Sequence, residues 1–447
     1  MGYQLVIRNG TVMTQMGRVE ADVAVTAGRI AAIGRIAERG ETDIDAKGLH
    51  LLPGAIDSQV HFREPGLTHK EDLASGTASA ALGGVATIFE MPNTKPNTVS
   101  AEAIAEKLAL AKGRAWTDHA FFVGAAAENA DELGRLERLP GAAGVKVFMG
   151  SSTGSLLVED DENLLRVLRS GKRRVAIHAE DEQRLRERLA LVRDGAEVAM
   201  HPVWRDVETA LLATKRVLKL ARLAGRRIHV LHVTTAEEAA LLAEHKDIAS
   251  MEVTPQHLTL AAPDCYERLG SFAQMNPPIR EERHREGLWR AVREGVADCL
   301  GSDHAPHTRE EKAKPYPQSP SGMPGVQTLM PLMLDHVHRG NLTLERLVDL
   351  TSAGPARLYN ITGKGRIAVG YDGDFTLVDL EAERRIEASR MATKCGWTPF
   401  DGMSVHGWPV ATILRGQVVM RDGELLGAPQ GRPVRFDESR EPEAAAD

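Results

Sequence analysis

The strongest constraint on this chain is a regular alternation, between residues 55 and 359, of short apolar runs with segments of helical periodicity. The apolar runs lie at 55–61, 85–91, 119–124, 144–148, 174–178, 228–233, 249–253 and 297–301. Most precede a helix-period stretch, such as 181–193 or 236–245. Eight strand–helix units in about 300 residues are typical of a (β/α)8 TIM barrel. We therefore predict an α/β fold whose main domain, residues 53–359, is such a barrel.

The two flanks of this segment carry short strands and turns without helical periodicity. Their strand-like runs lie at 3–8, 22–25, 29–33, 375–379, 410–414 and 418–420. The dipeptides Asn9-Gly10 and Ala27-Gly28 are typical of tight turns, and we expect a turn at each. We predict that residues 1–52 and 360–436 together form one small β-sandwich domain.

Composition excludes several classes of protein. The chain has 55 Lys and Arg against 62 Asp and Glu, and only 4% aromatic residues, which makes it a poor candidate for nucleic-acid binding. No apolar run reaches the roughly 18 residues of a membrane helix, and the N-terminus lacks the apolar core of a signal peptide. Cys265, Cys299 and Cys395 are far apart and indicate reduced packing thiols. We expect a cytoplasmic enzyme acting on a small molecule, with a disordered polar tail at 437–447.

Several histidines stand at the ends of predicted barrel strands, where barrel enzymes build their active sites. His61 ends the first strand, His178 the fifth, and His232 lies near the end of the sixth, while Asp303 follows the eighth. A single such histidine is more often a hydrogen-bonded core residue. Imidazoles and a carboxylate converging on one mouth instead favour a zinc-type site.

Lys146 stands at the end of the predicted fourth strand, in a position that faces the barrel mouth. A lysine there would lose its hydration unless it were paired or chemically changed. Carboxylation by CO2 would turn the amine into a carbamate anion able to bridge two metal ions. An ordinary lysine that extends to the rim is the alternative.

Four motifs carry a resemblance to a known family. They are residues 57–66 (DSQVHFREPG), 91–94 (MPNT), 275–278 (MNPP) and 301–308 (GSDHAPHT). Together they resemble signatures of the dihydroorotases of the amidohydrolase superfamily, and the resemblance runs over nearly the whole chain. The sequence REPG at 63–66 and the spacing of His307 favour dihydroorotases over the related hydantoinases and allantoinases.

The resemblance implies reversible hydrolysis of (S)-dihydroorotate to N-carbamoyl-L-aspartate, a step of de novo pyrimidine biosynthesis, by a metal-bound hydroxide. It also implies one or two Zn²⁺ ions as cofactor. His61 would bind the first ion, His178 and His232 the second, and carboxylated Lys146 would bridge them. Asp303 would bind the first ion and shuttle the proton from water to the departing nitrogen.

Substrate contacts follow from the same resemblance. Arg63 offers a planar fork that suits the carboxylate of dihydroorotate. The remaining implied contacts are Asn93 and His307 to the carboxylate, and Asn276 with the backbone of Ser321 and Gly322 to the ring amides. Without the motifs, Arg63 could be an ion-pair residue at the barrel mouth, and Asn93 and Asn276 turn residues beside proline.

The chain departs from the family pattern at one metal position. The family's first strand reads Asp-x-His-x-His, and Gln59 replaces the first histidine. Gln59 and His61 are two apart on a strand and share a face, but an amide oxygen is a weaker zinc ligand than imidazole. Three outcomes are open: weak binding of the first ion through Gln59, an empty first site with the second ion working alone, or a catalytically silent protein.

Two rival functions follow. A silent chain could be a non-catalytic partner of aspartate transcarbamoylase, and a different active enzyme could be a hydantoinase or allantoinase type of cyclic amidase. The retained ligand positions favour an active dihydroorotase. A homodimer is the default assembly, because closed pairs are the commonest oligomers.

Three further positions carry local predictions. His229 lies three residues before His232, so we expect its side chain on the opposite face, towards the helices. His257, at the seventh strand end, either orients a ligand or makes a core hydrogen bond. The small-residue loop 150–155 is either a connecting loop or a lid in which Thr153 closes over substrate.

Overall fold

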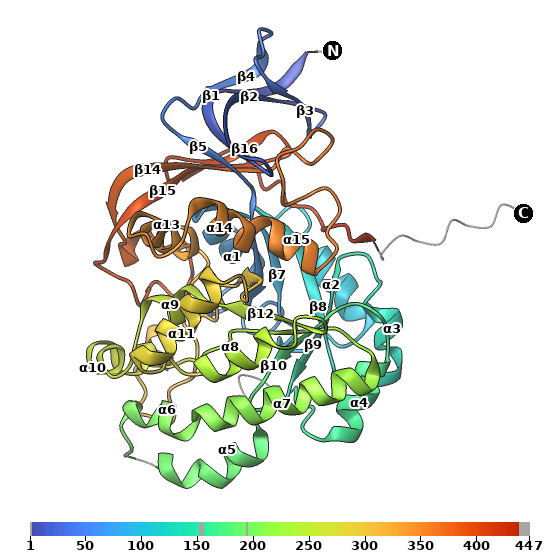
Figure 1. Cartoon of the computed structure of the whole chain (residues 1–447), viewed down its shortest axis with the longest axis vertical. Helices are drawn as coiled ribbons and strands as arrows, with labels where there is room; N and C mark the ends of the chain where they lie inside the picture. The colour runs from blue at the N-terminus through green and yellow to red at the C-terminus, as the bar shows by residue number, and fades with distance from the viewer. Residues whose placement is uncertain (1, 152–155, 194, 438–447) are drawn as a thin grey trace, which may run out of the picture.

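The chain folds into a barrel with a smaller β-sheet above it (Figure 1). The computed structural model describes residues 2–151, 156–193 and 195–437. The barrel strands are β6 (Ala55–Val60), β7 (Val85–Glu90), β8 (Asp118–Gly124), β9 (Ala142–Phe148), β10 (Val175–His178), β11 (Ile228–Val230), β12 (Ala249–Val253) and β13 (Cys299–Leu300). They are parallel neighbours in sequence order, and a bridge between Val60 and His304 closes the ring. The predicted α/β barrel is confirmed, with a strand at each predicted run.

Helices follow the barrel strands, and the longer ones cover the outside of the barrel. They are α1 (Leu73–Leu82), α2 (Ala101–Ala111), α3 (Leu133–Leu136), α4 (Asp161–Arg169), α5 (Glu182–Arg188), α6 (His201–Trp204), α7 (Val207–Ala224), α8 (Ala236–Ala243), α9 (Pro255–Thr259), α10 (Asp264–Leu269), α11 (Glu282–Arg293), α12 (Arg309–Lys312), α13 (Leu329–His338), α14 (Leu344–Val348) and α15 (Gly354–Leu358). Helix α7 illustrates how capping residues set the bounds of a helix. The Asp206 side chain accepts from the Thr209 amide at its start, and left-handed Gly225 ends it.

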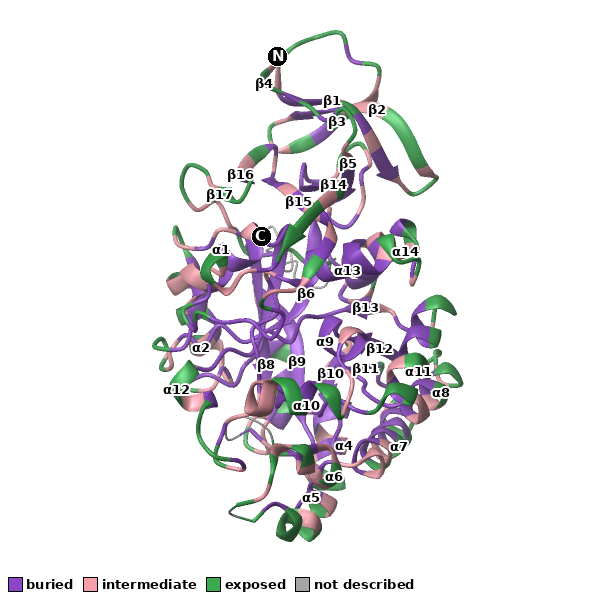
Figure 2. Cartoon of the chain, turned by 90° about the vertical axis from the view of Figure 1, so that its left-hand side faces the viewer, coloured by how far each residue is buried: buried purple, intermediate pink, exposed green. Residues whose placement is uncertain are grey.

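The barrel strands are purple along their whole length in Figure 2, because helices bury their outer faces and other side chains fill the interior. This explains why the strands read as continuous apolar runs. Phe89 and Phe122 pack edge-to-face with Tyr359 inside the barrel. Phe436, near the C-terminus, packs on Phe89 and is 2% exposed. The chain's last described residues therefore help to fill the barrel from its amino-terminal end.

The two flanks of the chain share one nine-stranded sheet. Its strands are β1 (Tyr3–Thr14), β2 (Gly17–Thr26), β3 (Arg29–Gly34), β4 (Gly40–Asp45), β5 (His50–Pro53), β14 (Phe375–Arg385), β15 (Ser404–Leu414), β16 (Gln417–Arg421) and β17 (Glu424–Leu425). Strand β5 pairs with both β1 and β14, which joins the N-terminal half to the C-terminal half. The division of the chain into domains at residues 52/53 and 359/360 stays a prediction.

One of the two predicted turns is wrong. Strand β1 runs straight through Asn9-Gly10, where the register shifts and Asn9 takes a φ of 59°. The dipeptide therefore forms a β-bulge, which uses the same left-handed preference as a turn. The second turn is confirmed: Thr26 pairs with Arg29 across Ala27-Gly28, whose φ values are 50° and 77°.

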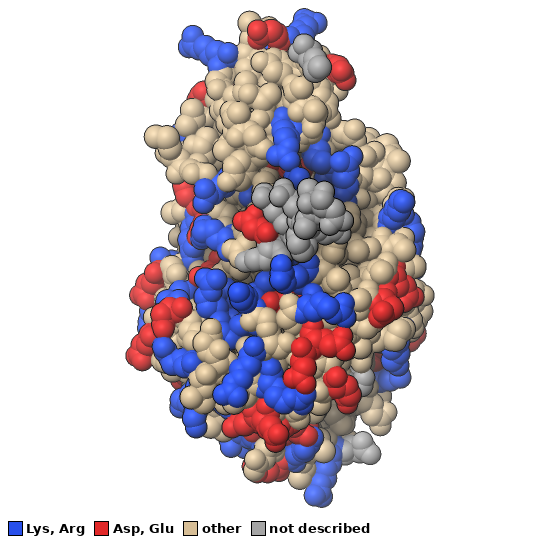
Figure 3. All heavy atoms as spheres, turned by 90° about the vertical axis from the view of Figure 1, so that its right-hand side faces the viewer, with Lys and Arg blue, Asp and Glu red and all other residues tan. Residues whose placement is uncertain are grey.

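Other expectations concern the ends and surface of the chain. The stretch 438–447 of the predicted tail and Thr153 of the predicted lid lie outside the described residues. Within the described part, no helix is both long and apolar enough to cross a membrane, and all three cysteines are buried and free. Acidic and basic side chains are interspersed over the face drawn in Figure 3.

Candidate active site

A small cavity lies where the barrel strands end. Its walls contain all of the predicted metal ligands, which are His61, Lys146, His178, His232 and Asp303. They also contain Gln59 and most of the predicted substrate contacts, which are Arg63, Asn93, Asn276, Ser321 and Gly322. Residues from six different strand ends thus meet around one space. The structure brings the predicted site together, and the role of each residue stays a prediction.

On one side of the cavity, His61 and Asp303 face each other. Nδ1 of His61 donates to Oδ1 of Asn93 at 2.8 Å, which leaves the lone pair on Nε2. That nitrogen lies 3.2 Å from Oδ1 of Asp303. Burial lowers the pKa of His61, so the ring is neutral and two acceptor atoms face each other. A cation between them would satisfy both.

On the other side, His178 and His232 meet in a similar way. Nε2 of His178 donates to Oε2 of Glu180 at 2.9 Å, so its Nδ1 carries the lone pair. This Nδ1 lies 3.1 Å from Nε2 of His232. Glu180 is held by an ion pair with buried Arg205, and its pKa is lowered to about 2 by Arg205 and by the His178 hydrogen bond, against the effect of burial. A carboxylate behind a ligating histidine is the usual support of a metal site.

Lys146 lies in the wall of the cavity with its amine completely buried. Its Nζ has no hydrogen-bond partner within the part of the chain that the structure describes, and it lies 4.4 Å from the centre of the Phe148 ring. Burial lowers the pKa of Lys146 to about 7. A large fraction of the amine is therefore uncharged near neutral pH, which is the form that reacts with CO2.

Three of the site residues have left-handed backbone. The φ angles are 65° for Arg63, 34° for His232 and 44° for Asp303. Residues other than glycine adopt this region at a cost of order 1–3 kcal/mol, and such residues cluster at functional sites. Each of the three lies two or three residues past the end of a barrel strand, and each lines the cavity.

Arg63 is an almost fully buried cation, 1% exposed. Its Nε donates to the carbonyl of Pro306, and Nη2 lies 3.3 Å from Nε2 of His307. Its remaining nitrogen, Nη1, has no partner, and no carboxylate of the described residues pairs with the guanidinium. Burial lowers the pKa of Arg63 to about 10, so it remains charged. His307 lies behind Arg63, outside the cavity wall, and accepts from Lys70.

Asn276 and Gly322 shape another part of the cavity wall. Oδ1 of Asn276 accepts from Nε2 of buried His201 at 2.9 Å, which turns its amide nitrogen away from that ring. Gly322 has a φ of 135°, and a Cβ there would come within 2.4 Å of the Ala305 carbonyl. Only glycine fits where the backbone of residues 321–322 meets the cavity.

The prediction for His229 is wrong, and His257 makes the core hydrogen bonds that were one of its two alternatives. His229 points into the barrel, where it contacts Ser250 and Tyr359 rather than the helices. Strand parity fails because β11 ends at Val230 and His232 has already left the strand. His257 makes core hydrogen bonds to Thr254 and to the carbonyl of Pro277.

Sequence reasoning missed several residues that support the site. Glu180 follows His178 by two positions, a spacing that could have indicated a support for the histidine. His201 lies on a short helix far from any barrel strand. Trp397, from the C-terminal flank, donates to the carbonyl of His307 at 2.8 Å. Neither of these two carries a recognisable local signal.

Comparison with known proteins places the chain in a family. The model of the family described as "Amidohydrolase family" matches residues 50–419, which include every residue of the cavity wall. The chain belongs to the amidohydrolase family. This confirms the predicted superfamily, and the match covers the whole barrel.

Individual members of the family are similar over almost their full length. A dihydroorotase of Halobacterium salinarum is 39% identical, covering 94% of this chain and 97% of that protein. An allantoinase of Rubrobacter xylanophilus is 37% identical, covering 97% and 98%. The solved structure of an L-hydantoinase from Arthrobacter aurescens superposes with a TM-score of 0.91 at 31% identity, covering 97% of this chain and 99% of that chain. These relatives confirm the fold of both the barrel and the small sheet.

Proposed function

We propose that this chain is a dihydroorotase, which interconverts (S)-dihydroorotate and N-carbamoyl-L-aspartate. The observation that carries the proposal is Arg63, a buried guanidinium that has no carboxylate partner among the described residues and whose Nη1 has no partner among them either. A buried cation of this kind requires an anionic partner. Dihydroorotate brings a carboxylate next to its cyclic amide, whereas hydantoin and allantoin have none. Relatives named dihydroorotase, such as those of Halobacterium salinarum and Methanosarcina mazei, support the same conclusion.

The residues present suit a metal ion of the zinc class. His178 and His232 turn ring nitrogens toward each other at 3.1 Å, and the partnerless amine of Lys146 lines the same cavity. We propose that these two histidines and carboxylated Lys146 hold one Zn²⁺, and that His61 and Asp303 hold a second. Such an ion supplies an activated water and polarises the amide carbonyl.

Gln59 lies beside the first of the two proposed metal positions, the one at His61 and Asp303. Its Nε2 donates to Oδ1 of Asp303 at 3.1 Å, while Oε1 has no partner. We propose that Gln59 acts chiefly by positioning Asp303 and leaves the first ion with weaker ligands than the second. The chain then works with one tightly held ion, and a second ion binds more weakly.

Substrate binding and proton transfer fall to the chain's own residues. Arg63 would pair with the substrate carboxylate with help from Asn93, while the carbonyl of Pro306 holds the guanidinium in place by accepting from Nε. Asn276 and the backbone of residues 321–322, which also line the cavity, would contact the ring amides. Asp303 would accept the proton of the attacking water and return it to the ring nitrogen as the C–N bond breaks, because an amide anion is too poor a leaving group.

We propose a cytoplasmic role in pyrimidine biosynthesis, with the chain acting as a homodimer, the commonest closed assembly. Association with aspartate transcarbamoylase would add a second partner. Light scattering of the purified chain, alone and mixed with that enzyme, tests both assemblies: a dimer mass and a larger complex are the expected species.

The test of function compares three substrates on the purified, zinc-loaded chain. Dihydroorotate should be hydrolysed, while hydantoin and allantoin, which lack the carboxylate, should be turned over at least 100-fold more slowly, a ratio expected when a buried charge loses its partner. Preference for allantoin or hydantoin would replace the proposal by a different cyclic amidase. Metal-loaded protein inactive on all three would indicate the non-catalytic alternative.

A further inference from the structure

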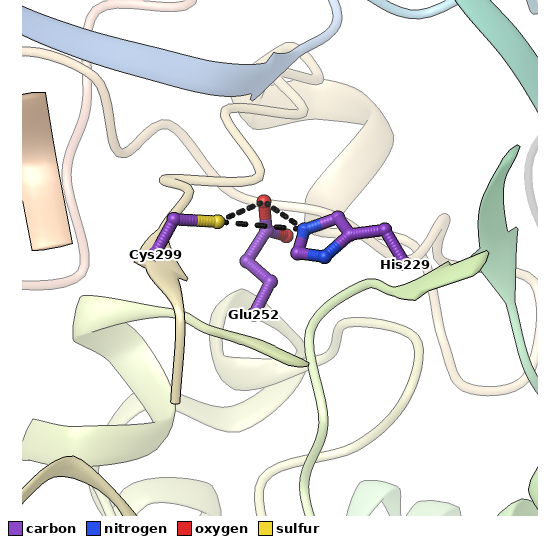
Figure 4. Close-up of side chains that lie close together, drawn as sticks. All are labelled: His229, Glu252 and Cys299. Carbon is purple, nitrogen blue, oxygen red and sulfur yellow. Dashed lines mark hydrogen bonds and ion pairs between the residues drawn. The ribbon is translucent and has the colours of Figure 1, made fainter. Parts of the chain in front are cut away.

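A second cluster of metal-type side chains lies inside the barrel, separate from the cavity wall. His229 on β11, Glu252 on β12 and Cys299 on β13 converge from three adjacent strands (Figure 4). Glu252 and Cys299 are register partners, and all three side chains are 0% exposed. They are the only group of three or more such residues within metal-binding reach of one another that the described part of the chain contains.

The distances between the ligand atoms suit a zinc-class ion. Sγ of Cys299 lies 3.4 Å from Nε2 of His229 and 3.9 Å from Oε2 of Glu252, and the latter two atoms are 3.8 Å apart. The circle through these three atoms has a radius of about 2.1 Å, close to the Zn–N and Zn–O bond lengths and slightly under Zn–S. An ion could therefore be bound with small movements of the side chains.

The surroundings supply what a metal site needs. Nδ1 of His229 is 2.7 Å from the Ser250 hydroxyl, a contact that orients the ring and leaves Nε2 directed at the other two ligands. Oγ of Ser58 lies 3.1 Å from Oε2 of Glu252 and 3.8 Å from Sγ of Cys299, where it could act as a fourth oxygen ligand. Sulfur, nitrogen and carboxylate oxygen together are a donor set that zinc accepts.

One feature indicates that the polypeptide alone leaves the cluster incomplete. No lysine or arginine of the described residues forms an ion pair with Glu252, so none of them balances the charge that its carboxylate would carry as a metal ligand. Beside the cluster, the ring of Tyr359 packs on His229, with 5.9 Å between the two ring centres. A divalent ion would supply the positive charge that these residues lack.

We propose that Cys299, His229 and Glu252 hold a structural divalent ion of the zinc class beneath the active site. Oε1 of Glu252 also accepts from the main-chain nitrogen of His232 at 3.2 Å. The ion would thereby fix the carboxylate that supports the left-handed turn of His232. Because the cluster is enclosed, the ion would enter while the chain folds.

Cobalt substitution distinguishes this ion from those of the active site, because only this cluster offers a thiolate. The chain is produced in zinc-depleted medium with cobalt added, and cobalt content and near-ultraviolet absorption are measured. The wild type should show a thiolate-to-cobalt charge-transfer band. Cys299→Ser should lose the band and one cobalt per chain, while Cys265→Ser and Cys395→Ser, which change buried cysteines elsewhere, should keep both.

A wild-type spectrum without the band, or a band that survives Cys299→Ser, would overturn the proposal. X-ray absorption of the wild-type protein gives an answer even if Cys299→Ser does not fold. One sulfur neighbour at about 2.3 Å from the metal is expected. A metal shell of nitrogen and oxygen alone would contradict a site at Cys299.

Discussion

Nε2 of Gln59 donates a hydrogen bond to Oδ1 of Asp303 over 3.1 Å, across the first and last barrel strands. The same Oδ1 lies 3.2 Å from Nε2 of His61. Gln59 therefore contacts the carboxylate that we propose as proton shuttle. Its amide holds Asp303 in place but adds only a weak oxygen to the first metal position.

Gln59→His should strengthen that first position, because an imidazole on the same face as His61 supplies a better zinc ligand. Zinc bound per chain after dialysis should rise by up to one ion relative to the wild type. Gln59→Asn, whose shorter side chain cannot reach equally far, serves as the control. Unchanged zinc content in Gln59→His would argue against a first site at His61 and Asp303.

Arg63→Ala should weaken substrate binding by roughly 2–5 kcal/mol, because the substrate carboxylate would then be buried without a partner. The expected result is a large rise in KM for dihydroorotate in steady-state kinetics. Arg63→Lys keeps the charge but loses the planar fork and should be intermediate. A wild-type KM in Arg63→Ala would refute the carboxylate assignment.

Asp303→Ala should lower turnover by at least the 10²–10⁴-fold typical of a lost general acid–base, even in protein that retains metal at His178 and His232. Metal analysis of the same sample separates loss of the proton shuttle from loss of the ion. Substantial residual turnover would remove Asp303 from the proposed mechanism.

Glu180→Gln should weaken metal binding about 10–100-fold, because the carboxylate fixes the His178 ring that faces His232. Competition with a chelator measures the affinity. Glu182→Gln, two residues further on and directed at the main chain of Ser151, should leave it unchanged. Equal affinity in both variants would show that Glu180 does not support the metal.

Stability should fall as the pH is lowered below about 6.5. Burial lowers the pKa of His201 from 6.5 to about 3, so between these values the unfolded chain binds a proton that the folded chain does not. Glu180, with its pKa lowered from 4.5 to about 2, removes further stability over that lower range. Thermal unfolding of the metal-free protein should show a smaller decrease between pH 6.5 and 4 in His201→Gln, and an equal decrease would contradict the role of His201.

The barrel and most residues of the cavity wall could be predicted from the sequence, because the candidate metal ligands stand at the ends of recognisable strands. In a parallel barrel all carboxyl ends meet at one mouth, so His61, His178 and Asp303 could be brought together without knowing any contact. The same reasoning placed Lys146 beside them. The four sequence motifs then indicated hydrolysis of a cyclic amide as the class of reaction.

The sequence could not predict contacts that depend on where a strand stops or on packing between distant segments. His229 was assigned to the wrong face because β11 ends two residues before His232. The positions of His201 and Trp397 follow from the packing of a short helix and of the C-terminal flank, which no local pattern encodes. At Asn9-Gly10, the left-handed backbone preference that predicts a turn forms a β-bulge instead, so the dipeptide alone does not distinguish the two structures.

An anomalous-scattering map from crystals of the zinc-loaded protein tests the proposed catalytic centre most directly. It should show a peak bonded to Nδ1 of His178 and Nε2 of His232, with the side-chain end of Lys146 extended by a carboxylate that reaches the same ion. A cavity wall with these groups in place and no metal peak among them would contradict the proposed metal-dependent hydrolysis.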